Sequence, residues 1–115
     1  MFDFEKLEVY QIAANQNIKV LKFISGNKEI DEFIKDQWKR SSLNIVLNLA
    51  EGVGRITHAD KKHFLTMSRG SVFESVAIIE TLKGMKLINP VFYDELYADY
   101  ESISKMLLAM FRSYH

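Results

Sequence analysis

The stretch from Asn48 to Arg55, "NLAEGVGR", brings a carboxylate, a guanidinium and two glycines together at the end of an apolar segment. Such residues could form an acid–base pair between Glu51 and Arg55, a glycine-rich loop for phosphate, or the polar end of a helix. A dinucleotide loop needs a third glycine, but Thr57 stands at that position, and the Gly-Lys-Ser/Thr sequence of a P-loop is absent. The stretch therefore does not predict a nucleotide site.

The histidines do not form a metal-binding pattern. Di-iron carboxylate bundles need Glu-x-x-His motifs on two helices, whereas this chain has one related motif, Asp60-x-x-His63. His58 and His63 are five positions apart and do not share a helical face, and His115 is the last residue. No serine stands in the Gly-x-Ser-x-Gly motif of hydrolases. We expect no metal, no other cofactor, no small-molecule substrate and no enzymatic activity.

The composition is that of a globular protein. The chain has 115 residues, 48% of them hydrophobic and 26% charged, which suits one domain. Fifteen basic and fifteen acidic residues cancel, so the net charge attracts neither nucleic acid nor an anionic membrane. The absence of cysteine fits a reducing compartment, and no apolar run reaches the roughly 20 residues of a membrane span. With an acidic start unlike a signal peptide, the sequence predicts a cytoplasmic protein.

The chain breaks expected from glycine, proline and capping residues divide the sequence into four segments. Asn27, Thr57 and Asn89 could each cap a following helix, and Asn89 is followed by proline at the first helical position. Acidic residues gather near the start of each segment and basic residues near its end, as the helix dipole favours. These signals predict helices at about residues 3–25, 28–54, 58–87 and 90–113. The expected fold is all-α, a single-domain up-down-up-down antiparallel four-helix bundle.

Apolar residues recur at helical spacing in every segment. In the first two helices this spacing assigns to the core Phe4, Leu7, Ala14, Ile18 and Leu21, then Ile30, Phe33, Ile34, Trp38, Ile45 and Leu49. The later half of the second helix, "LNIVLNLA", is apolar around most of its circumference, which is more than one bundle normally buries. We expect another subunit to cover the excess, at Leu43, Val46, Leu47 and Ala50. The alternative is a tilted, deeply packed helix.

Small and polar residues predict a close contact between the second and third helices. If these two helices fold back on each other, residues whose numbers sum to about 115 lie at the same level. Asn48 would then face the serines of the third helix and could form hydrogen bonds with their hydroxyls. Gly52 would let the helices approach, and Gly54 would let the chain leave the second helix. The polar network expected here has a structural rather than a catalytic role. It comprises Arg40, Asn44, Asn48, Glu51, Gly52, Gly54, Arg55, Arg69, Ser71 and Glu74.

Three segments carry a family resemblance: "F-x-x-L-x-V-Y-Q-x-A" from Phe4 to Ala13, "QWKRSSLNIVLNLAEGVGR" from Gln37 to Arg55, and "SRGSVFES" from Ser68 to Ser75. Through them the chain resembles, over nearly its whole length, the four-helix-bundle proteins encoded in intervening sequences of bacterial 23S rRNA genes. The resemblance implies a bundle that assembles into a ring-like homo-oligomer, with the pentamer favoured, and implies no enzymatic activity. Ser42 and Leu49 depart mildly from the alanine and isoleucine usual in this family.

Two functions remain open at this point. The first is a non-enzymatic oligomeric scaffold or interaction protein. The second is a nucleic-acid-binding accessory protein, because a related branch, the accessory proteins of diversity-generating retroelements, binds nucleic acid and a reverse transcriptase through a strongly basic surface. Residues 35–86 hold nine basic and five acidic residues, so weak RNA or DNA contact would fall on Lys35, Lys39, Lys61 and Lys62. One exposed basic stripe would favour nucleic acid, and dispersed or ion-paired side chains would favour the scaffold. The residues whose arrangement distinguishes the two functions are Lys35, Lys39, Arg40, Arg55, Lys61, Lys62 and Arg69.

Overall fold

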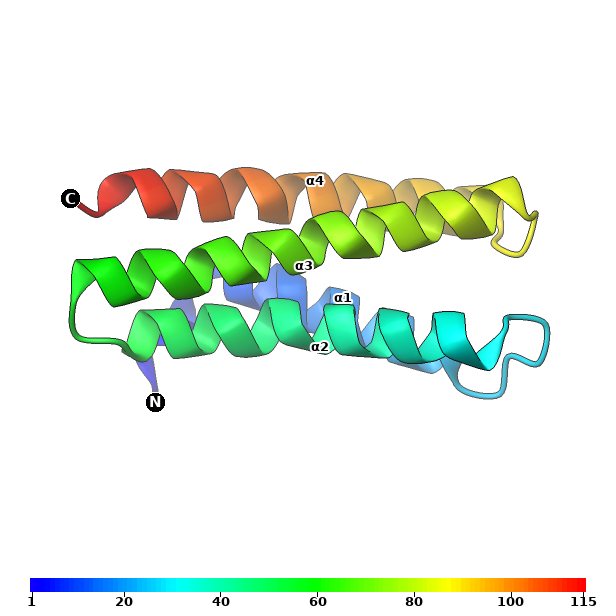
Figure 1. The fold of residues 1–115 in the computed structure, drawn as a ribbon, viewed down its shortest axis with the longest axis horizontal. Helices are drawn as coiled ribbons and strands as arrows, with labels where there is room; N and C mark the ends of the chain where they lie inside the picture. Colours follow the sequence, from blue (N-terminus) through cyan, green and yellow to red (C-terminus); the bar gives the residue numbers. More distant parts are fainter.

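The computed structural model describes all 115 residues and contains four α-helices and no β-strand. The helices are α1 (Glu8–Ile24), α2 (Glu32–Gly54), α3 (His58–Gly84) and α4 (Pro90–Ser113), preceded by a 3-10 helix, η1, at Asp3–Lys6. Successive helices run in opposite directions along a bundle of 44 × 22 × 21 Å (Figure 1). Each helix packs against the next, and α1 also packs against α4. The predicted all-α fold is confirmed.

Three helices begin at a side chain that accepts hydrogen bonds from the first turn. At α3, Thr57 Oγ1 accepts from the Asp60 amide at 3.1 Å. At α4, Asn89 Oδ1 accepts from two amides of the first turn, and Pro90 occupies the first helical position, where no N–H is needed. At α2, Asp31 Oδ1 accepts from a first-turn amide at 2.8 Å. Local capping chemistry therefore sets where these helices start.

The helix ends differ from the expected ones in three places. The first predicted helix is interrupted at Leu7, where the backbone is extended between η1 and α1. The second begins at Glu32 rather than residue 28, because Asn27 accepts from two following amides and stabilises a turn instead of capping a helix. The third ends at Gly84 rather than residue 87, since Lys86 adopts a left-handed φ of 60°, through which a right-handed helix cannot continue.

One apolar core receives side chains from all four helices. α1, however, turns a different face to this core from the one expected, and its buried residues are Val9, Ala13, Gln16, Val20 and Ile24. Ile18 and Leu21, predicted as core, are 50% and 38% exposed, and Phe33 at the start of α2 is 70% exposed. The prediction was wrong because α1 carries two apolar stripes, and periodicity alone does not say which of them faces the bundle.

An ion pair joins α1 to α4 at the surface. Lys19 Nζ lies 2.6 Å from Glu95 Oε1 and 3.5 Å from Asp99 Oδ2. The hydrogen bond with Glu95 is the main reason that the pKa of Lys19 is raised above its ordinary value. All three side chains are more than a third exposed, so solvent screening keeps the contribution of this pair to stability small.

Candidate functional site

α2 and α3 approach closely where Gly52 meets α3. A Cβ added at Gly52 would lie 3.1 Å from Phe64 Cβ and 3.4 Å from the Lys61 carbonyl oxygen. A side chain at this position would therefore press against α3. Beside this contact, Lys61 Nζ donates a hydrogen bond to the Val53 carbonyl at 2.8 Å, which satisfies one of the open carbonyls at the end of α2.

Serine hydroxyls join the same two helices further along the pair. Ser41 Oγ and Ser75 Oγ lie 2.8 Å apart, and Ser68 Oγ donates to the Ile45 carbonyl at 2.7 Å. The serine of α3 nearest to Asn48 thus bonds to the backbone of α2 and not to the asparagine side chain. The expectation that Asn48 satisfies the serine hydroxyls is wrong, because a buried hydroxyl pairs with the carbonyl that is already beside it.

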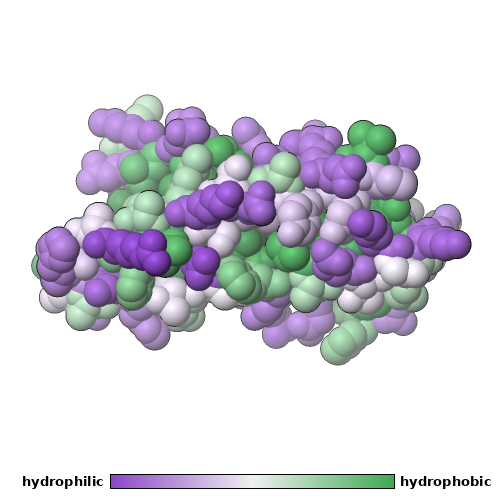
Figure 2. All heavy atoms as spheres, turned by 90° about the horizontal axis from the view of Figure 1, so that it is seen from above, coloured by the Kyte–Doolittle hydropathy of each residue, from purple (hydrophilic) through white to green (hydrophobic).

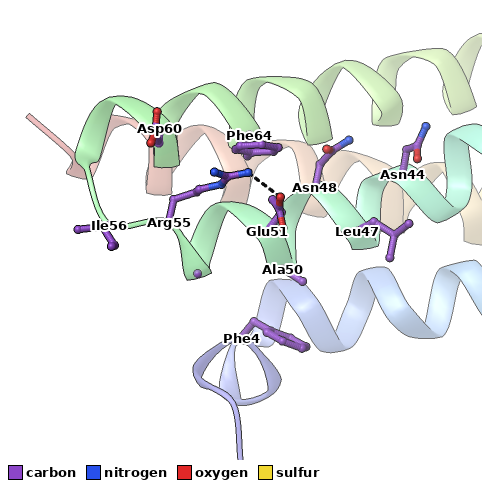
Figure 3. Close-up of a pocket in the computed structure, with 11 residues that line it drawn as sticks. Phe4, Asn44, Leu47, Asn48, Ala50, Glu51, Arg55, Ile56, Asp60 and Phe64 are labelled. Carbon is purple, nitrogen blue, oxygen red and sulfur yellow. Dashed lines mark hydrogen bonds and ion pairs between the residues drawn. The ribbon is translucent and has the colours of Figure 1, made fainter.

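The "NLAEGVGR" stretch forms the last turns of α2. Glu51 Oε1 and Arg55 Nη2 lie 2.7 Å apart, with side chains 52% and 42% exposed, and the guanidinium lies 4.5 Å from the centroid of the Phe64 ring (Figure 3). Gly54 does not release the chain as expected: it remains helical without a positive φ. The direction changes at Arg55, whose backbone is extended with φ −73° and ψ 153°.

A shallow groove of about 890 Å³ lies over α2 beside this ion pair. Asn44 and Asn48, one turn apart, point toward α3, whereas Leu47 and Ala50 lie on the side of α1 and η1 (Figure 3). Both carboxamides are half-buried, so each can still offer a donor and an acceptor to another molecule. A mixed polar and apolar groove of this kind suits contact with a protein surface.

Several members of the predicted polar network are not brought together. Arg40 and Glu74 are exposed, and Ser71 is buried, with 7% of its surface exposed. Arg69 turns to the other neighbour of α3, where its Nε donates to the Ser104 carbonyl of α4 at 3.3 Å. Contact between polar side chains of α2 and α3 is therefore limited to the serine pair, while the ion pair of the last helical turn belongs to α2 alone.

A buried polar cluster, which the sequence analysis missed, crosses the core. Trp38 Nε1 donates to Tyr100 Oη at 3.1 Å, and Gln16 Nε2 donates to the Leu96 carbonyl at 2.9 Å. Burial raises the pKa of Tyr100 to about 12, and hydrogen bonding with Trp38, Ser75 and Gln16 opposes this rise. Gln16, Trp38, Ser75 and Tyr100 come from α1, α2, α3 and α4 in turn, and we call this set the polar layer.

The basic residues expected to contact nucleic acid mostly have partners within the chain. Lys35 is 7% exposed, with its ammonium group 3.2 Å from Glu32, so the expectation that it lies on the surface is wrong. Lys61 donates to a backbone carbonyl of α2, and Lys62 lies 4.6 Å from the centroid of an aromatic ring of α4. Lys39 is exposed. These residues do not form one exposed basic stripe.

The residues expected at a subunit contact divide into two groups. Leu43 and Leu47 are 43% and 52% exposed, and Ala50 beside them is half-buried. Val46 is 8% exposed and belongs to the core of the same chain, so its assignment to the contact is corrected. Val46 lies one turn from the buried residues Ser42 and Leu49, and therefore on the buried side of α2.

The histidines lie at one end of the bundle, away from any cluster of ligands. His58 Nδ1 is 3.2 Å from the His115 carbonyl oxygen, and the His63 ring packs against Phe64 at a centroid distance of 5.3 Å. No three histidine or acidic side chains are arranged to hold a metal ion. None of the helices combines the length and the apolarity that crossing a membrane requires.

The fold places the chain in the class of all-α four-helix proteins. Comparison with known proteins identifies the family. The family model described as "23S rRNA-intervening sequence protein" matches residues 5–109. The chain therefore belongs to the 23S rRNA-intervening sequence protein family, which confirms the resemblance noted in the sequence. A crystal structure of a protein of unknown function from the S23 ribosomal protein family of Bacteroides thetaiotaomicron VPI-5482 is similar in fold. Its TM-score is 0.85 at 19% sequence identity, over 90% of this chain and 97% of that chain. No curated protein matches the chain.

Proposed function

We propose that this chain is a homo-oligomeric interaction protein that acts in the cytoplasm without a catalytic site of its own, and that the pentamer is its favoured assembly. The observation that carries the proposal is the outward side of α2, where Leu43 and Leu47 are 43% and 52% exposed. A single exposed leucine is ordinary, but apolar side chains gathered on one surface mark an interaction site.

This surface continues onto α1. Asn17 Oδ1 accepts a hydrogen bond from Ser42 Oγ at 2.8 Å, so the two helices are in direct contact beside Leu43. Leu21, one turn beyond Asn17 on α1, is 38% exposed and is not buried in the core. We call the surface formed by Leu21, Leu43 and Leu47 the α1/α2 face.

The dimensions of the molecule allow an interface of ordinary size there. One side of the bundle measures 44 by 21 Å, which is comparable with the roughly 800 Å² per partner that standard interfaces bury. The carboxamides of Asn44 and Asn48 lie in the adjoining groove and could supply the polar rim that such interfaces normally have.

The arrangement of the basic residues favours an interaction protein over a nucleic-acid-binding one. Seven basic residues distinguish the two functions by their arrangement. Five of them have a partner within the chain: Lys35, Arg55, Lys61, Lys62 and Arg69. The net charge of the whole chain is zero. Lys35 and Arg55 are ion-paired, and the other three are held at separate places by carbonyl oxygens and a ring, which leaves them less available to phosphates than a free basic stripe would be. The cytoplasmic location rests on the absence of cysteine.

Light scattering of the purified chain tests the proposal. We expect an assembly several times heavier than 13.4 kDa at micromolar concentration, and dissociation when Leu47→Asp places a charge in the α1/α2 face. Circular dichroism should show unchanged helicity, because Leu47 is 52% exposed in the single chain. The matched control is Val91→Asp, since Val91 is 75% exposed at the start of α4. A parent protein that is monomeric under these conditions would overturn the proposal.

A binding assay separates the nucleic-acid alternative from the proposed one. We expect any complex with RNA or DNA to be weak and to dissociate as salt is added, because few phosphates can be neutralised. A nanomolar complex that survives at roughly 200 mM salt would favour the accessory-protein function instead.

A further inference from the structure

A second apolar area lies on the side of the bundle opposite the α1/α2 face. Between α3 and α4 is a groove of about 320 Å³, and the aromatic side chains at its rim, Phe73 and Tyr97, are 57% and 40% exposed. The guanidinium of Arg69 lies 4.9 Å from the centroid of the Phe73 ring. Figure 2 looks onto this side and shows apolar areas among the polar side chains. We call it the α3/α4 groove.

The two areas face away from each other within one molecule. The backbone of α1 lies beside those of α2 and α4 but not α3, and the backbone of α2 lies beside those of α1 and α3 but not α4. The four helices therefore stand at the corners of a square, with α1 and α2 on one side and α3 and α4 on the opposite side (Figure 1). No single copy can cover one area with the other.

We propose that the two areas cover each other between copies, the α1/α2 face of one chain packing into the α3/α4 groove of the next. This inference rests on the proposed function and names the surfaces that make the assembly. Two chemically different patches on opposite sides are what a head-to-tail contact uses. A two-fold contact needs only one patch that pairs with itself, which would leave the second area uncovered.

The two areas lie at the same height along the bundle. The contact between Ser41 and Ser75 places Leu43, two residues later on α2, level with Phe73, two residues earlier on the antiparallel α3. Two bundles that stand side by side, parallel and without sliding, thus bring Leu43 of one copy to Phe73 of the next. A head-to-tail contact without a shift along the axis can close into a ring instead of growing into a filament.

Opposite charges on the two areas also lie at the same level along the bundle axis. Trp38 bonds to Tyr100, so the next residues along the parallel helices α2 and α4, Lys39 and Glu101, are level as well. Lys39 is exposed near the α1/α2 face, and Glu101 is exposed in the lining of the α3/α4 groove. In the proposed contact the ammonium group of one copy meets the carboxylate of the next, as complementary interfaces require.

Two variants, each damaged on one side, test the head-to-tail contact. Leu43→Asp places a charge in the α1/α2 face, and Phe73→Asp places one at the rim of the α3/α4 groove. Both residues are exposed in the single chain, so circular dichroism should show the same helicity as in the parent protein. Val91→Asp serves again as the control, because it adds the same charge at an exposed apolar position outside both areas.

We expect each variant alone to run as a 13.4 kDa monomer at micromolar concentration, with the control keeping the size of the parent assembly. Mixing the two variants should give a one-to-one heterodimer and nothing larger. The intact groove of the Leu43→Asp chain accepts the intact α1/α2 face of the Phe73→Asp chain, and every further site is damaged. Native mass spectrometry would measure both the size and the composition.

Two results would overturn the inference while leaving the oligomeric function standing. The first is a Phe73→Asp protein that keeps the full size of the parent assembly, which would exclude the α3/α4 groove from the contact. The second is a mixture of two folded, monomeric variants that stays monomeric, as a self-pairing patch would give. A parent protein that is itself monomeric would instead overturn the proposed function.

A charge exchange tests the relative height of the copies independently. Lys39→Glu and Glu101→Lys should each weaken the assembly, and the double variant should recover most of the lost affinity, because the pair is restored with its charges reversed. A double variant that is weaker than either single one would exclude the alignment.

Discussion

Trp38 and Tyr100 lie on helices whose backbones are not neighbours, and their side chains meet across the diagonal of the bundle, with indole Nε1 3.1 Å from phenol Oη. Both side chains are completely buried. A buried indole N–H has no water to bond to, so its only compensation for leaving solvent is this phenol. The pair therefore ties α2 to α4 more specifically than apolar packing could.

Tyr100→Phe should destabilise the fold by about 1–3 kcal/mol, because it leaves the Trp38 N–H unpaired in the core. The midpoint of chemical denaturation would measure this loss. Tyr97→Phe is the matched control, since Tyr97 is 40% exposed and should change stability little. The double variant Trp38→Phe with Tyr100→Phe should lose less than the two single losses added, since it removes the donor along with the acceptor. Simple additivity would show that the hydrogen bond contributes nothing.

Stability should fall as the pH rises from about 10 to 12. The Tyr93 hydroxyl donates to Glu80 Oε1 at 2.5 Å, and this bond is the main reason that the pKa of Tyr93 is raised to about 12. Burial raises the pKa of Tyr100 to about 12 as well. Folding thus favours the protonated phenols, so their contribution is complete below pH 10, the ordinary pKa, and is lost as the pH rises through the folded-state values.

Denaturation curves across the alkaline range would measure this loss. Tyr93→Phe should flatten the dependence on pH, because one of the two late-titrating groups is removed. Tyrosinate absorbance followed during the titration would identify the groups directly. An equally steep decline in the Tyr93→Phe protein would exclude Tyr93 as a source.

Gly52→Ala and Gly70→Ala should change stability in opposite directions. In a helix interior, glycine is less favourable than alanine by about 0.8–1.0 kcal/mol, so Gly70→Ala, whose Cβ would meet nothing within 4 Å, should stabilise the chain. At Gly52 the new methyl group would lie 3.1 Å from Phe64 Cβ, and overpacking of this kind typically costs about 1–3 kcal/mol. Thermal unfolding of both variants would measure these changes in stability. An equal gain at the two sites would show that α2 and α3 do not need glycine to approach.

Glu51→Ala should lower the stability of the single chain by less than about 1 kcal/mol, because its ion pair with Arg55 is largely exposed. The groove that this pair lines adjoins the α1/α2 face, so the variant has a second readout in the size of the assembly. Arg55→Ala combined with Glu51→Ala should cost less than the sum of the single changes. Full stability and full assembly in Glu51→Ala would contradict a structural role for the pair.

The helix count and most helix starts could be predicted because they depend on local chemistry. Thr57 and Asn89 cap their helices in the expected way, since a capping oxygen needs only its own following amides. Asn27 has the same side-chain chemistry, but its oxygen stabilises a turn. Nothing in the residue type distinguishes the two outcomes.

The face that each helix turns inward could be predicted only in part. On α1, Ile18 and Leu21 were assigned to the core, whereas Val9, Ala13 and Gln16 are buried. The polar layer was missed for a related reason, because apolar spacing does not mark a buried polar residue such as Gln16. Its hydrogen bonds reach α4, some eighty positions later in the chain, and no local pattern reveals a partner so distant. The level pairing of α2 with α3 was anticipated, while the bonds of individual side chains depended on which carbonyl lay closest.

The polar layer also restricts how the helices can be positioned relative to one another in the bundle. Leucine, isoleucine and valine fill similar volumes, so a core made of them alone would tolerate a helix displaced by one turn, about 5.4 Å. Such a displacement would carry the Trp38 indole away from its phenol and the Gln16 amide away from the Leu96 carbonyl, leaving both without partners in an apolar medium. Displaced arrangements of this kind are therefore penalised by these few groups, and the least hydrophobic residues of the core favour the observed one.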